Sequence, residues 1–278
     1  MPFFDYIQFK LSLKNTMIFY KVIRYLLAPN KLYKRINKYF QHKNIIKNYN
    51  YNLLENEQCL KFRQLELDYE RSKIILDKLY IANPELKVEM TSCHHNLFAS
   101  LSESKKYDFK DILEIGTHSG AGAALLSTLF QNSMVDTIDL PDNHNYVESG
   151  SYGLQDNEKR NSFFQKRNEL LKGCKNLKFT QMDSSGLTFL YKKYNFIWVD
   201  ANHEFPYVAV DIANALRLLQ PGGLIACDDV RINGDVMKTL EQFYNAGFID
   251  FVLIHKRTVL PENLDLVGKY IAVVKLKP

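Results

Sequence analysis

From about residue 110 to its end, the chain alternates short apolar runs with stretches of helical pattern. Each run has four to six residues and is bounded by turn residues, which is typical of buried strands. Strands that alternate with helices predict a parallel sheet covered by helices on both faces. The predicted strands are 112–115, 135–138, 177–180, 196–199, 224–227, 249–254 and 270–274. The predicted helices lie near 120–131, 158–172, 206–219 and 235–246.

The last two predicted strands, 249–254 and 270–274, have no helical stretch between them. Parallel strands are usually joined through a crossover helix, so we expect these two to pair antiparallel. The predicted fold is therefore α/β. It is a Rossmann-like, doubly wound, seven-stranded and mostly parallel sheet with an antiparallel last strand, preceded by an α-helical N-terminal extension.

Charge separates an N-terminal arm from the rest of the chain. Residues 1–50 hold ten Lys and Arg against the single acid Asp5, a charge of +9, whereas the whole chain carries +5. The remainder is therefore mildly acidic, and a nucleic-acid groove across the sheet is not indicated. We divide the chain into a basic amphipathic arm (1–50), a helical lead-in segment (51–107) and a sheet-forming domain (108–278).

The arm mixes Phe, Tyr, Leu and Ile with Lys and Arg. This pattern predicts an amphipathic helix, which either lies on an anionic bilayer or docks on a partner or on the protein's own body. No stretch approaches the roughly 20 apolar residues of a membrane span, and no secretory signal is visible. The four cysteines have no paired spacing, which fits a reducing compartment. We expect a cytoplasmic protein with peripheral contact at the inner membrane face.

Apolar residues recur every seven positions in the lead-in segment, which predicts one long helix over about 53–82. We expect Asn83 and Pro84 to end this helix, because the residue before proline avoids helical geometry. The single apolar ridge favours packing against the sheet-forming domain or against a second copy in a homodimer rather than a long coiled coil. The ridge consists of Leu53, Leu60, Leu67, Ile74 and Ile81.

A glycine loop over 111–122 follows the first strand and opens an Ala-rich helix. Glycines let the backbone approach a ligand closely, and a helix N-terminus offers free N–H groups. A dinucleotide fingerprint needs Gly-x-Gly-x-x-Gly, but the third position here is His118, and Glu114 would repel a pyrophosphate. The loop therefore indicates a different adenosine-containing cofactor.

Three successive strands end in acids: Glu114 before the glycine turn, Asp139 after the second strand, and Asp183 with Ser184 after the third. An acid in the position of Asp139 accepts the ribose hydroxyls in adenosine-binding α/β folds. Each acid alone is equally explained as a helix cap or a solvated loop residue. Their joint occurrence favours a binding site.

The segment from Glu114 to Gly120 resembles the Glu-x-Gly-x-x-x-Gly motif of class I S-adenosylmethionine-dependent methyltransferases. The resemblance implies S-adenosylmethionine as cofactor, with Glu114 near the donor's amino-acid end and Asp183 and Ser184 near its adenine. The residues that it implies for donor binding are Glu114, Gly116, Thr117, Ser119, Gly120, Asp139, Asp183 and Ser184.

The fourth and fifth predicted strands also end in polar residues: Asp200 and His203 after the fourth, Asp228 and Asp229 after the fifth. Carboxyl ends of neighbouring parallel strands share one crevice, so these side chains are expected to converge. Three carboxylates in one crevice repel each other unless a cation joins them, and hard oxygen ligands suit Mg²⁺ or Mn²⁺. The alternatives are a helix-start residue for His203 and solvated loop residues for the aspartates.

Asp-x-x-His, Pro-Gly-Gly and Asp-Asp in this order look like the metal-dependent O-methyltransferase branch that modifies sugars, polysaccharides and catechol-type hydroxyls. The resemblance implies a metal on Asp200, Asp228 and Asp229, with His203 as general base. The Asp/Asn-Pro-Pro-aromatic motif of base N-methyltransferases does not occur at Asp200, which argues against a nucleic-acid substrate.

The resulting hypothesis is an O-methyltransferase for a hydroxyl of a sugar or related polar metabolite, in surface polysaccharide or natural-product biosynthesis. One alternative keeps the fold and donor but needs no metal. Another is a non-catalytic cofactor-binding scaffold tethered by the arm. The polar segment 142–161 is either a lid over the acceptor or a surface excursion.

Overall fold

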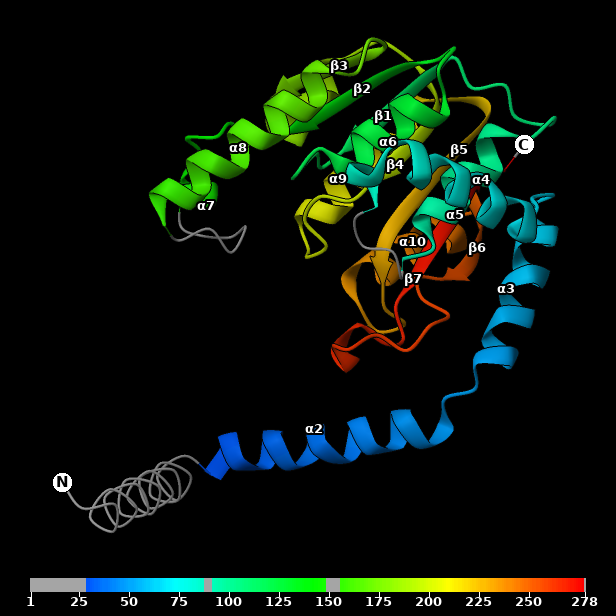
Figure 1. Cartoon of the computed structure of the whole chain (residues 1–278), viewed down its shortest axis with the longest axis vertical. Helices are drawn as coiled ribbons and strands as arrows, with labels where there is room; N and C mark the ends of the chain where they lie inside the picture. Colours follow the sequence, from blue (N-terminus) through cyan, green and yellow to red (C-terminus); the bar gives the residue numbers. More distant parts are fainter. Residues whose placement is uncertain (1–28, 88–91, 149–155, 278) are drawn as a thin grey trace. The chain divides into compact units, whose positions relative to one another are not determined.

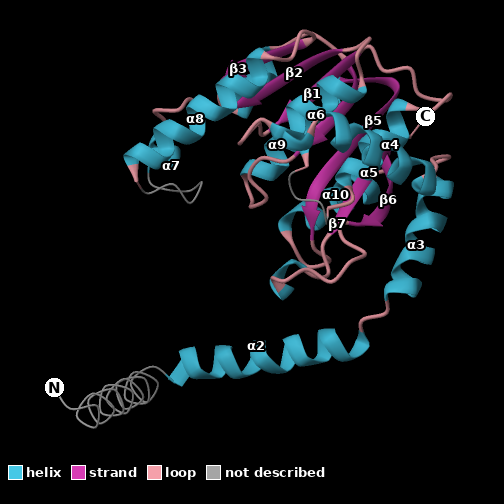
Figure 2. Ribbon diagram, viewed as in Figure 1, coloured by secondary structure: helices cyan, strands magenta, loops and turns pink. Residues whose placement is uncertain are grey.

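The computed structural model describes residues 29–87, 92–148 and 156–277. It divides into two compact units, 1–50 and 51–278. In the first unit the described element is the helix α2 (Pro29–Asn48), and the remaining predictions for residues 1–28 lie outside the described residues. The second unit contains a seven-stranded sheet with its helices (Figure 2).

The sheet has the strand order β3-β2-β1-β4-β5-β7-β6 (Figure 1). The first five strands in this order are parallel, and β7 runs antiparallel to both β5 and β6. The predicted fold and the predicted antiparallel pairing of the last two strands are confirmed. The strands are β1 (Asp111–Ile115), β2 (Met134–Asp139), β3 (Leu177–Gln181), β4 (Tyr194–Val199), β5 (Leu219–Val230), β6 (Ile249–His255) and β7 (Tyr270–Leu276).

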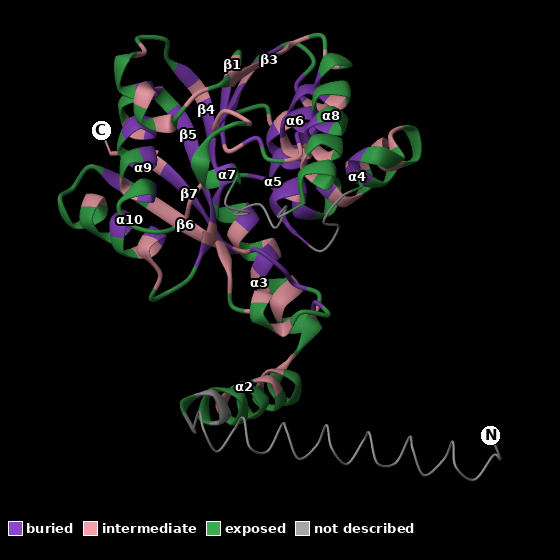
Figure 3. Cartoon of the chain, turned by 90° about the vertical axis from the view of Figure 1, so that its left-hand side faces the viewer, coloured by how far each residue is buried: buried purple, intermediate pink, exposed green. Residues whose placement is uncertain are grey.

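Helices cover both faces of the sheet, so residues of its central strands β1 and β4 are buried whichever way they point. Ile112 of β1 belongs to one hydrophobic core, and its neighbour Leu113 belongs to the other. Figure 3 shows the resulting buried strands between helices with exposed outer surfaces. Neither face carries the polar alternation of a half-exposed sheet, which is why the strands read as continuous apolar runs.

The helices of the sheet-forming part lie where the sequence places them. The helices α5 (His94–Ser102) and α6 (Ala121–Leu129) contribute to the first core, on one face of the sheet. The helices α9 (Tyr207–Leu218) and α10 (Asp235–Asn245) contribute to the second core, on the other face. The helix α8 (Asn157–Lys172) begins at Asp156, whose side chain accepts hydrogen bonds from two backbone amides of its first turn. The remaining short elements are α7 (Asn145–Glu148) and the 3-10 turns η1 (Pro84–Leu86), η2 (Ser184–Phe189) and η3 (Leu264–Leu266).

The predicted long helix over 53–82 is wrong, because it is two helices, α3 (Tyr51–Gln64) and α4 (Tyr69–Ala82). Glu66 has a positive φ of 61° and turns the chain between them, and Asp68 then caps α4 by accepting from the amide of Arg71 at 2.9 Å. The predicted end at Asn83 is confirmed. Most of the predicted ridge is exposed rather than packed on the sheet, namely Leu53, Leu60, Ile74 and Ile81.

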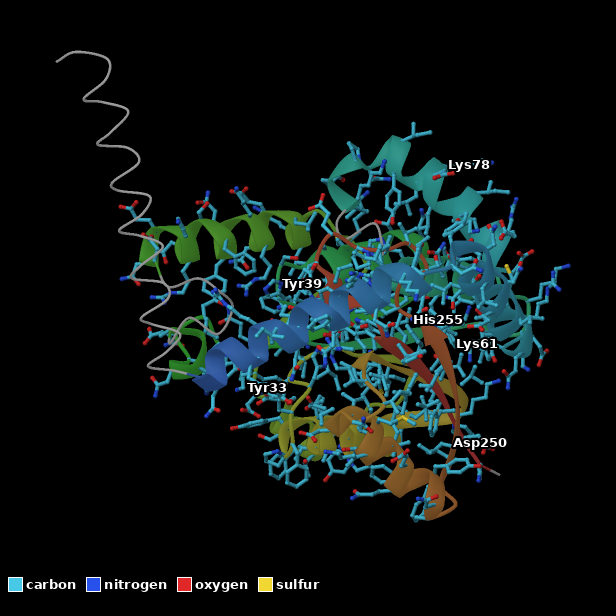
Figure 4. The ribbon with its side chains drawn as sticks, turned by 90° about the horizontal axis from the view of Figure 1, so that it is seen from below. Tyr33, Tyr39, Lys61, Lys78, Asp250 and His255 are labelled. Atoms are coloured by element: carbon cyan, nitrogen blue, oxygen red, sulfur yellow. The ribbon has the colours of Figure 1, made fainter. Side chains whose placement is uncertain are left out.

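A buried glutamine closes the edge of the sheet at β6. Gln58 of α3 donates to the carbonyl of His255 at 3.1 Å and accepts from its amide at 2.9 Å. His255 lies at the end of β6, as Figure 4 shows, where an edge strand would otherwise present unpaired backbone groups. The side chain of Gln58 therefore forms, at His255, the two hydrogen bonds that a neighbouring strand would form.

Candidate functional site

A cavity of about 550 Å³ opens at the carboxyl ends of the parallel strands. This volume lies in the range of small-ligand sites, and the position is the usual one for ligands in open α/β sheets. Six of its lining residues are aspartates and one is lysine: Asp139, Asp183, Asp200, Asp211, Asp228, Asp229 and Lys256. The other lining residues include Gly116, His118, His144, Tyr146, Ser184, Asn202 and Tyr207.

The glycine turn after β1 is held in place by backbone geometry. Gly116 and Gly120 have φ values of 105° and 80°, which side-chain-bearing residues rarely adopt. A Cβ atom on Gly116 would collide with the backbone carbonyl of Asp200. The turn can therefore lie directly against the end of β4, and it places Gly116 in the cavity wall.

Glu114 does not line the cavity. It is 2% exposed and accepts a hydrogen bond from the hydroxyl of Thr137 at 2.5 Å. Burial raises the pKa of Glu114 to about 8, against the opposing effect of that hydrogen bond. The same Thr137 hydroxyl lies 2.6 Å from that of Thr117, so both residues support the turn from below.

The predicted donor-binding residues therefore fall into two groups. Gly116, Asp139, Asp183 and Ser184 line the cavity, whereas Glu114, Thr117, Ser119 and Gly120 do not. The second group shapes the turn and the start of α6. Strand alternation explains this difference at β1, because Ile115 points into the cavity and its neighbour Glu114 points away.

Two of the cavity aspartates also accept hydrogen bonds from backbone amides, and one of them performs the capping role that the sequence left open. Asp183 caps η2 and accepts from the amide of Ser185 at 2.8 Å, and the hydroxyl and amide of Ser185 lower the pKa of Asp183. Asp139 accepts from the amides of His118 at 2.6 Å and Leu140 at 2.8 Å. Capping and cavity lining are therefore not exclusive here.

Asp211 is a cavity residue that the sequence analysis did not single out. It lies in α9, is 1% exposed, and one of its carboxylate oxygens has no hydrogen-bond partner within the described part of the chain. Burial raises its pKa to about 6, and the Ser184 hydroxyl acts in the opposite direction. The only signal in the sequence is an acid on the otherwise apolar face of a helix.

The four residues of the predicted crevice are brought together. The Nε2 atom of His203 lies 3.6 Å from Oδ1 of Asp200 and 3.8 Å from Oδ2 of Asp229. Asp228 and Asp229 belong to β5, which continues to Val230, and Asp228 is 3% exposed. Asp228 is therefore not a solvated loop residue, and His203 precedes α9 without capping it.

Two lysines enter this crevice from the other side. The ammonium group of Lys256 contacts Asp228 Oδ2 and lies 2.6 Å from Asp229 Oδ1, and that of Lys269 contacts Asp229 Oδ2. Across residues 29–87, 92–148 and 156–277, no group of three His, Cys, Asp or Glu side chains is arranged to hold a metal ion. The predicted Mg²⁺ or Mn²⁺ on Asp200, Asp228 and Asp229 is not confirmed, and the carboxylates of Asp228 and Asp229 are paired with Lys256 and Lys269.

Burial and neighbouring charges shift the pKa values of Asp200, Asp229 and His203. Burial, with a contribution from the neighbouring Asp228 carboxylate, raises the pKa of Asp200 well above its usual value. Burial would also raise the pKa of Asp229, but Lys256 and Lys269 outweigh it and hold this pKa below its usual range. Burial lowers the pKa of His203, although the Asp229 carboxylate opposes the change. His203 is therefore favoured in its neutral, proton-accepting form.

Comparison with known proteins gives one family match and one related sequence. A family model described as a methyltransferase domain matches residues 113–230. A probable phthiotriol/phenolphthiotriol dimycocerosates methyltransferase 2 of Mycobacterium ulcerans is 26% identical over 144 residues, which are 51% of this chain and 48% of that protein. The match thus spans about half the length of this relative.

Solved structures with a similar fold include two that are bound to S-adenosylmethionine or its product. One is the O-methyltransferase TomG of Streptomyces achromogenes with S-adenosylmethionine, at a TM-score of 0.47 and 16% identity, covering 73% of this chain and 89% of that one. The other is an O-methyltransferase of Bacillus cereus with S-adenosylhomocysteine, at a TM-score of 0.41 and 17% identity, covering 61% and 74%.

Proposed function

We propose that this chain, whose residues 113–230 match a family model described as a methyltransferase domain, is a class I, S-adenosylmethionine-dependent methyltransferase that transfers a methyl group to a hydroxyl of a sugar or related polar metabolite. The expected setting is surface polysaccharide or natural-product biosynthesis.

The observation that carries the choice of donor is the charge of the cavity. Six aspartates against one lysine line it. Lys256 and Lys269 pair with Asp228 and Asp229, and the remaining excess of aspartates favours a cationic ligand over a phosphate. S-adenosylmethionine is a cation that also carries hydroxyl and amino donors. Among the described residues, Oδ1 of Asp211 and Oδ1 of Asp228 are buried and have no hydrogen-bond partner, and such donors would satisfy them. The residues present therefore fit this donor and disfavour a dinucleotide.

His203 is the residue best suited to receive the acceptor's proton. Its imidazole is favoured in the neutral form, and Nε2 lies 3.8 Å from the Asp229 carboxylate, which would stabilise the imidazolium after proton transfer. S-adenosylmethionine, when bound, would supply an electrophilic methyl group and would leave as S-adenosylhomocysteine. His203 would take the proton of the acceptor hydroxyl as the hydroxyl oxygen is methylated.

The acceptor class is inferred from the outer cavity wall. Asn202, Tyr207 and Tyr146 offer amide and hydroxyl groups there, and such side chains hydrogen-bond to a polyhydroxylated molecule. His144 and Tyr146 come from the segment 142–161, which supports the idea that this segment closes over the acceptor. It begins with α7, and residues 149–155 lie outside the described residues.

The first test is calorimetry with S-adenosylmethionine and S-adenosylhomocysteine, followed by transfer of a radiolabelled methyl group to a panel of sugars and polar alcohols. We expect saturable donor binding and alkali-stable labelling of a hydroxyl acceptor. If neither donor nor product binds, the proposed function is wrong.

Replacement of the base gives a sharper prediction. In His203→Asn, we expect kcat to fall by about 10²- to 10⁴-fold while the dissociation constant of the donor changes by less than about threefold. His42→Asn, in α2, is the matched control and is expected to keep the wild-type rate. A His203→Asn protein with wild-type kcat would exclude the role of His203 as base.

A further inference from the structure

The topology of the sheet explains why lysines reach an acidic crevice. Because β7 is antiparallel to both β5 and β6, the strand β6 runs parallel to β5. The carboxyl end of β6 therefore lies at the same edge as the carboxyl end of β5, and the three strands lie side by side (Figure 1). Lys256 directly follows β6, and Lys269 directly precedes β7.

The hairpin between β6 and β7 fixes the two lysines. The amide of Lys256 donates to the carbonyl of Lys269 at 3.0 Å, which continues the ladder one step beyond His255 and Tyr270. On its other side, the carbonyl of Lys256 accepts from the amide of Cys93 at 2.7 Å. Lys256 thus has a backbone held from two directions, and its ammonium group enters the crevice from a rigid element.

The ion cluster is buried, unlike an ordinary surface salt bridge. The side chains of Lys256 and Asp228 are 6% and 4% exposed, and those of Lys269 and Asp229 are 12% and 18% exposed. Buried charges are retained only when they are paired and hydrogen-bonded. By contrast, the ion pair of Lys238 with Asp235 on α10 spans 3.1 Å with a lysine that is 61% exposed.

A divalent cation and this ammonium group compete for the same oxygens. A metal would need lone pairs of Asp228 and Asp229 at about 2.0–2.2 Å, whereas Oδ2 of Asp228 and both carboxylate oxygens of Asp229 already accept N–H groups of Lys256 and Lys269. The two positive charges would also repel a metal ion. An ammonium has three N–H groups, of which these two carboxylates take two, and Lys256 also lines the cavity.

We propose that Lys256 is a built-in cation of the active crevice, which holds Asp228 and Asp229 in place, donates an N–H to the acceptor hydroxyl, and makes a divalent metal unnecessary. This inference rests on the proposed methyl transfer for its catalytic part. A hydroxyl oxygen that accepts from an ammonium loses its proton more readily, and Lys256 thereby performs the task that a metal performs in metal-dependent enzymes.

The decisive experiment measures metal binding, which does not depend on knowing the acceptor. The full-length wild-type protein is titrated with Mn²⁺, and free Mn²⁺ is followed by electron paramagnetic resonance. We expect no stoichiometric site, and a titration that matches that of Asp228→Asn. One Mn²⁺ bound per wild-type chain, and lost in Asp228→Asn, would overturn the proposal.

A second measurement tests Lys256 itself. Lys256→Met keeps the length of the side chain but removes its charge, which leaves the buried Asp228 carboxylate without its lysine and leaves Asp229 with Lys269 alone. We expect its melting temperature to fall by at least about 5 °C, whereas Lys238→Met, which removes an exposed ion pair, should change it by less than about 1 °C. Equal melting temperatures for the wild type and Lys256→Met would contradict the buried ion cluster. If Lys256→Met does not fold, the Mn²⁺ titration of the wild-type protein tests whether the crevice binds a metal.

Once an acceptor is identified, activity gives a third readout. We expect the wild-type rate to be unchanged after dialysis against EDTA, and Lys256→Met to lose kcat by about 100-fold or more. A wild-type rate that falls on chelation and returns with Mg²⁺ would overturn the metal-free inference. Absence of donor binding would instead overturn the proposed function, so the two failures are distinguishable.

Discussion

Glu114 is a buried acid whose ionisation opposes folding. Its pKa is about 8 in the folded protein, against a usual value of 4.5. Below pH 4.5 the group is protonated in both states. Between 4.5 and about 8 the unfolded chain loses this proton while the folded protein keeps it, so the free energy of unfolding falls as pH rises, by up to about 1.4 kcal/mol per pH unit.

Glu114→Gln removes this titration and keeps an oxygen for the Thr137 hydroxyl. We therefore expect the stability of the variant relative to the wild type to increase steadily from pH 5 to pH 8, as measured by urea unfolding at each pH. The exposed Glu241→Gln is the control and should show no such trend. A constant difference between Glu114→Gln and the wild type across this range would show that Glu114 ionises normally.

Residues of the crevice were predictable from the sequence where they directly follow a parallel strand, because the carboxyl ends of such strands lie at the same edge of the sheet. Asp200, His203, Asp228 and Asp229 follow parallel strands, so their convergence follows from chain order alone. Lys256 also follows a strand, but its place at the same edge depends on β7 lying between β5 and β6. That strand order is a tertiary property, so the sequence shows the carboxylates of the crevice but not the lysines that pair with them.

At the scale of elements, every strand was predicted to within a few residues at each end except β5, which begins at Leu219 and passes through the Pro-Gly-Gly turn. Strands buried on both faces give continuous apolar runs, which are easily located. The break between α3 and α4 was missed, because the seven-residue repeat continues through it and Glu66 gives no turn signal.

Asp68 defines the start of α4, and this gives a prediction for the element. Asp68→Ala removes the acceptor for the amide of Arg71, and loss of such a cap costs about 1 kcal/mol. We expect a melting temperature lower by roughly 2–4 °C, whereas Asp68→Asn, which can still accept, should lie within about 1 °C of the wild type. Equal destabilisation by the two variants would mean that charge, not capping, stabilises this helix start.

The exposed ridge on α3 and α4 bears on assembly. Leu53 and Leu60 are 54% and 62% exposed on α3, and Ile74 and Ile81 are 49% and 84% exposed on α4. These four residues belong to neither hydrophobic core of the described part of the chain. A homodimer through this surface stays a prediction.

At the scale of the whole molecule, the arm is the part with a distinct composition. Within the part of the chain that the structure describes, no helix has the length and apolar composition to span a bilayer. The helix α2 contains six Lys and Arg and no acid, and five of its apolar side chains are 45% to 67% exposed. They are Tyr33, Ile36, Tyr39, Phe40 and Ile46, of which Tyr33 and Tyr39 are labelled in Figure 4.

These apolar residues recur at spacings of three, four and seven, so they share one face of α2, as in helices that lie in a membrane interface. Because every charge on the helix is positive, we predict that α2 binds a bilayer containing anionic lipids. The measurement is co-sedimentation of the full-length protein with phosphatidylglycerol vesicles, with phosphatidylcholine vesicles for comparison.

The charge-reversed variant Lys34→Glu/Lys43→Glu/Lys47→Glu should bind anionic vesicles at least about tenfold more weakly, since each basic residue near the surface contributes about 1 kcal/mol. The matched control, Lys166→Glu/Lys172→Glu/Lys175→Glu, reverses three exposed lysines of the second unit and should bind as the wild type does. Equal loss in both triple variants would assign binding to overall charge. No binding of the wild type would favour the alternative in which the helix docks on protein, and the enzyme would then meet its acceptor away from the membrane.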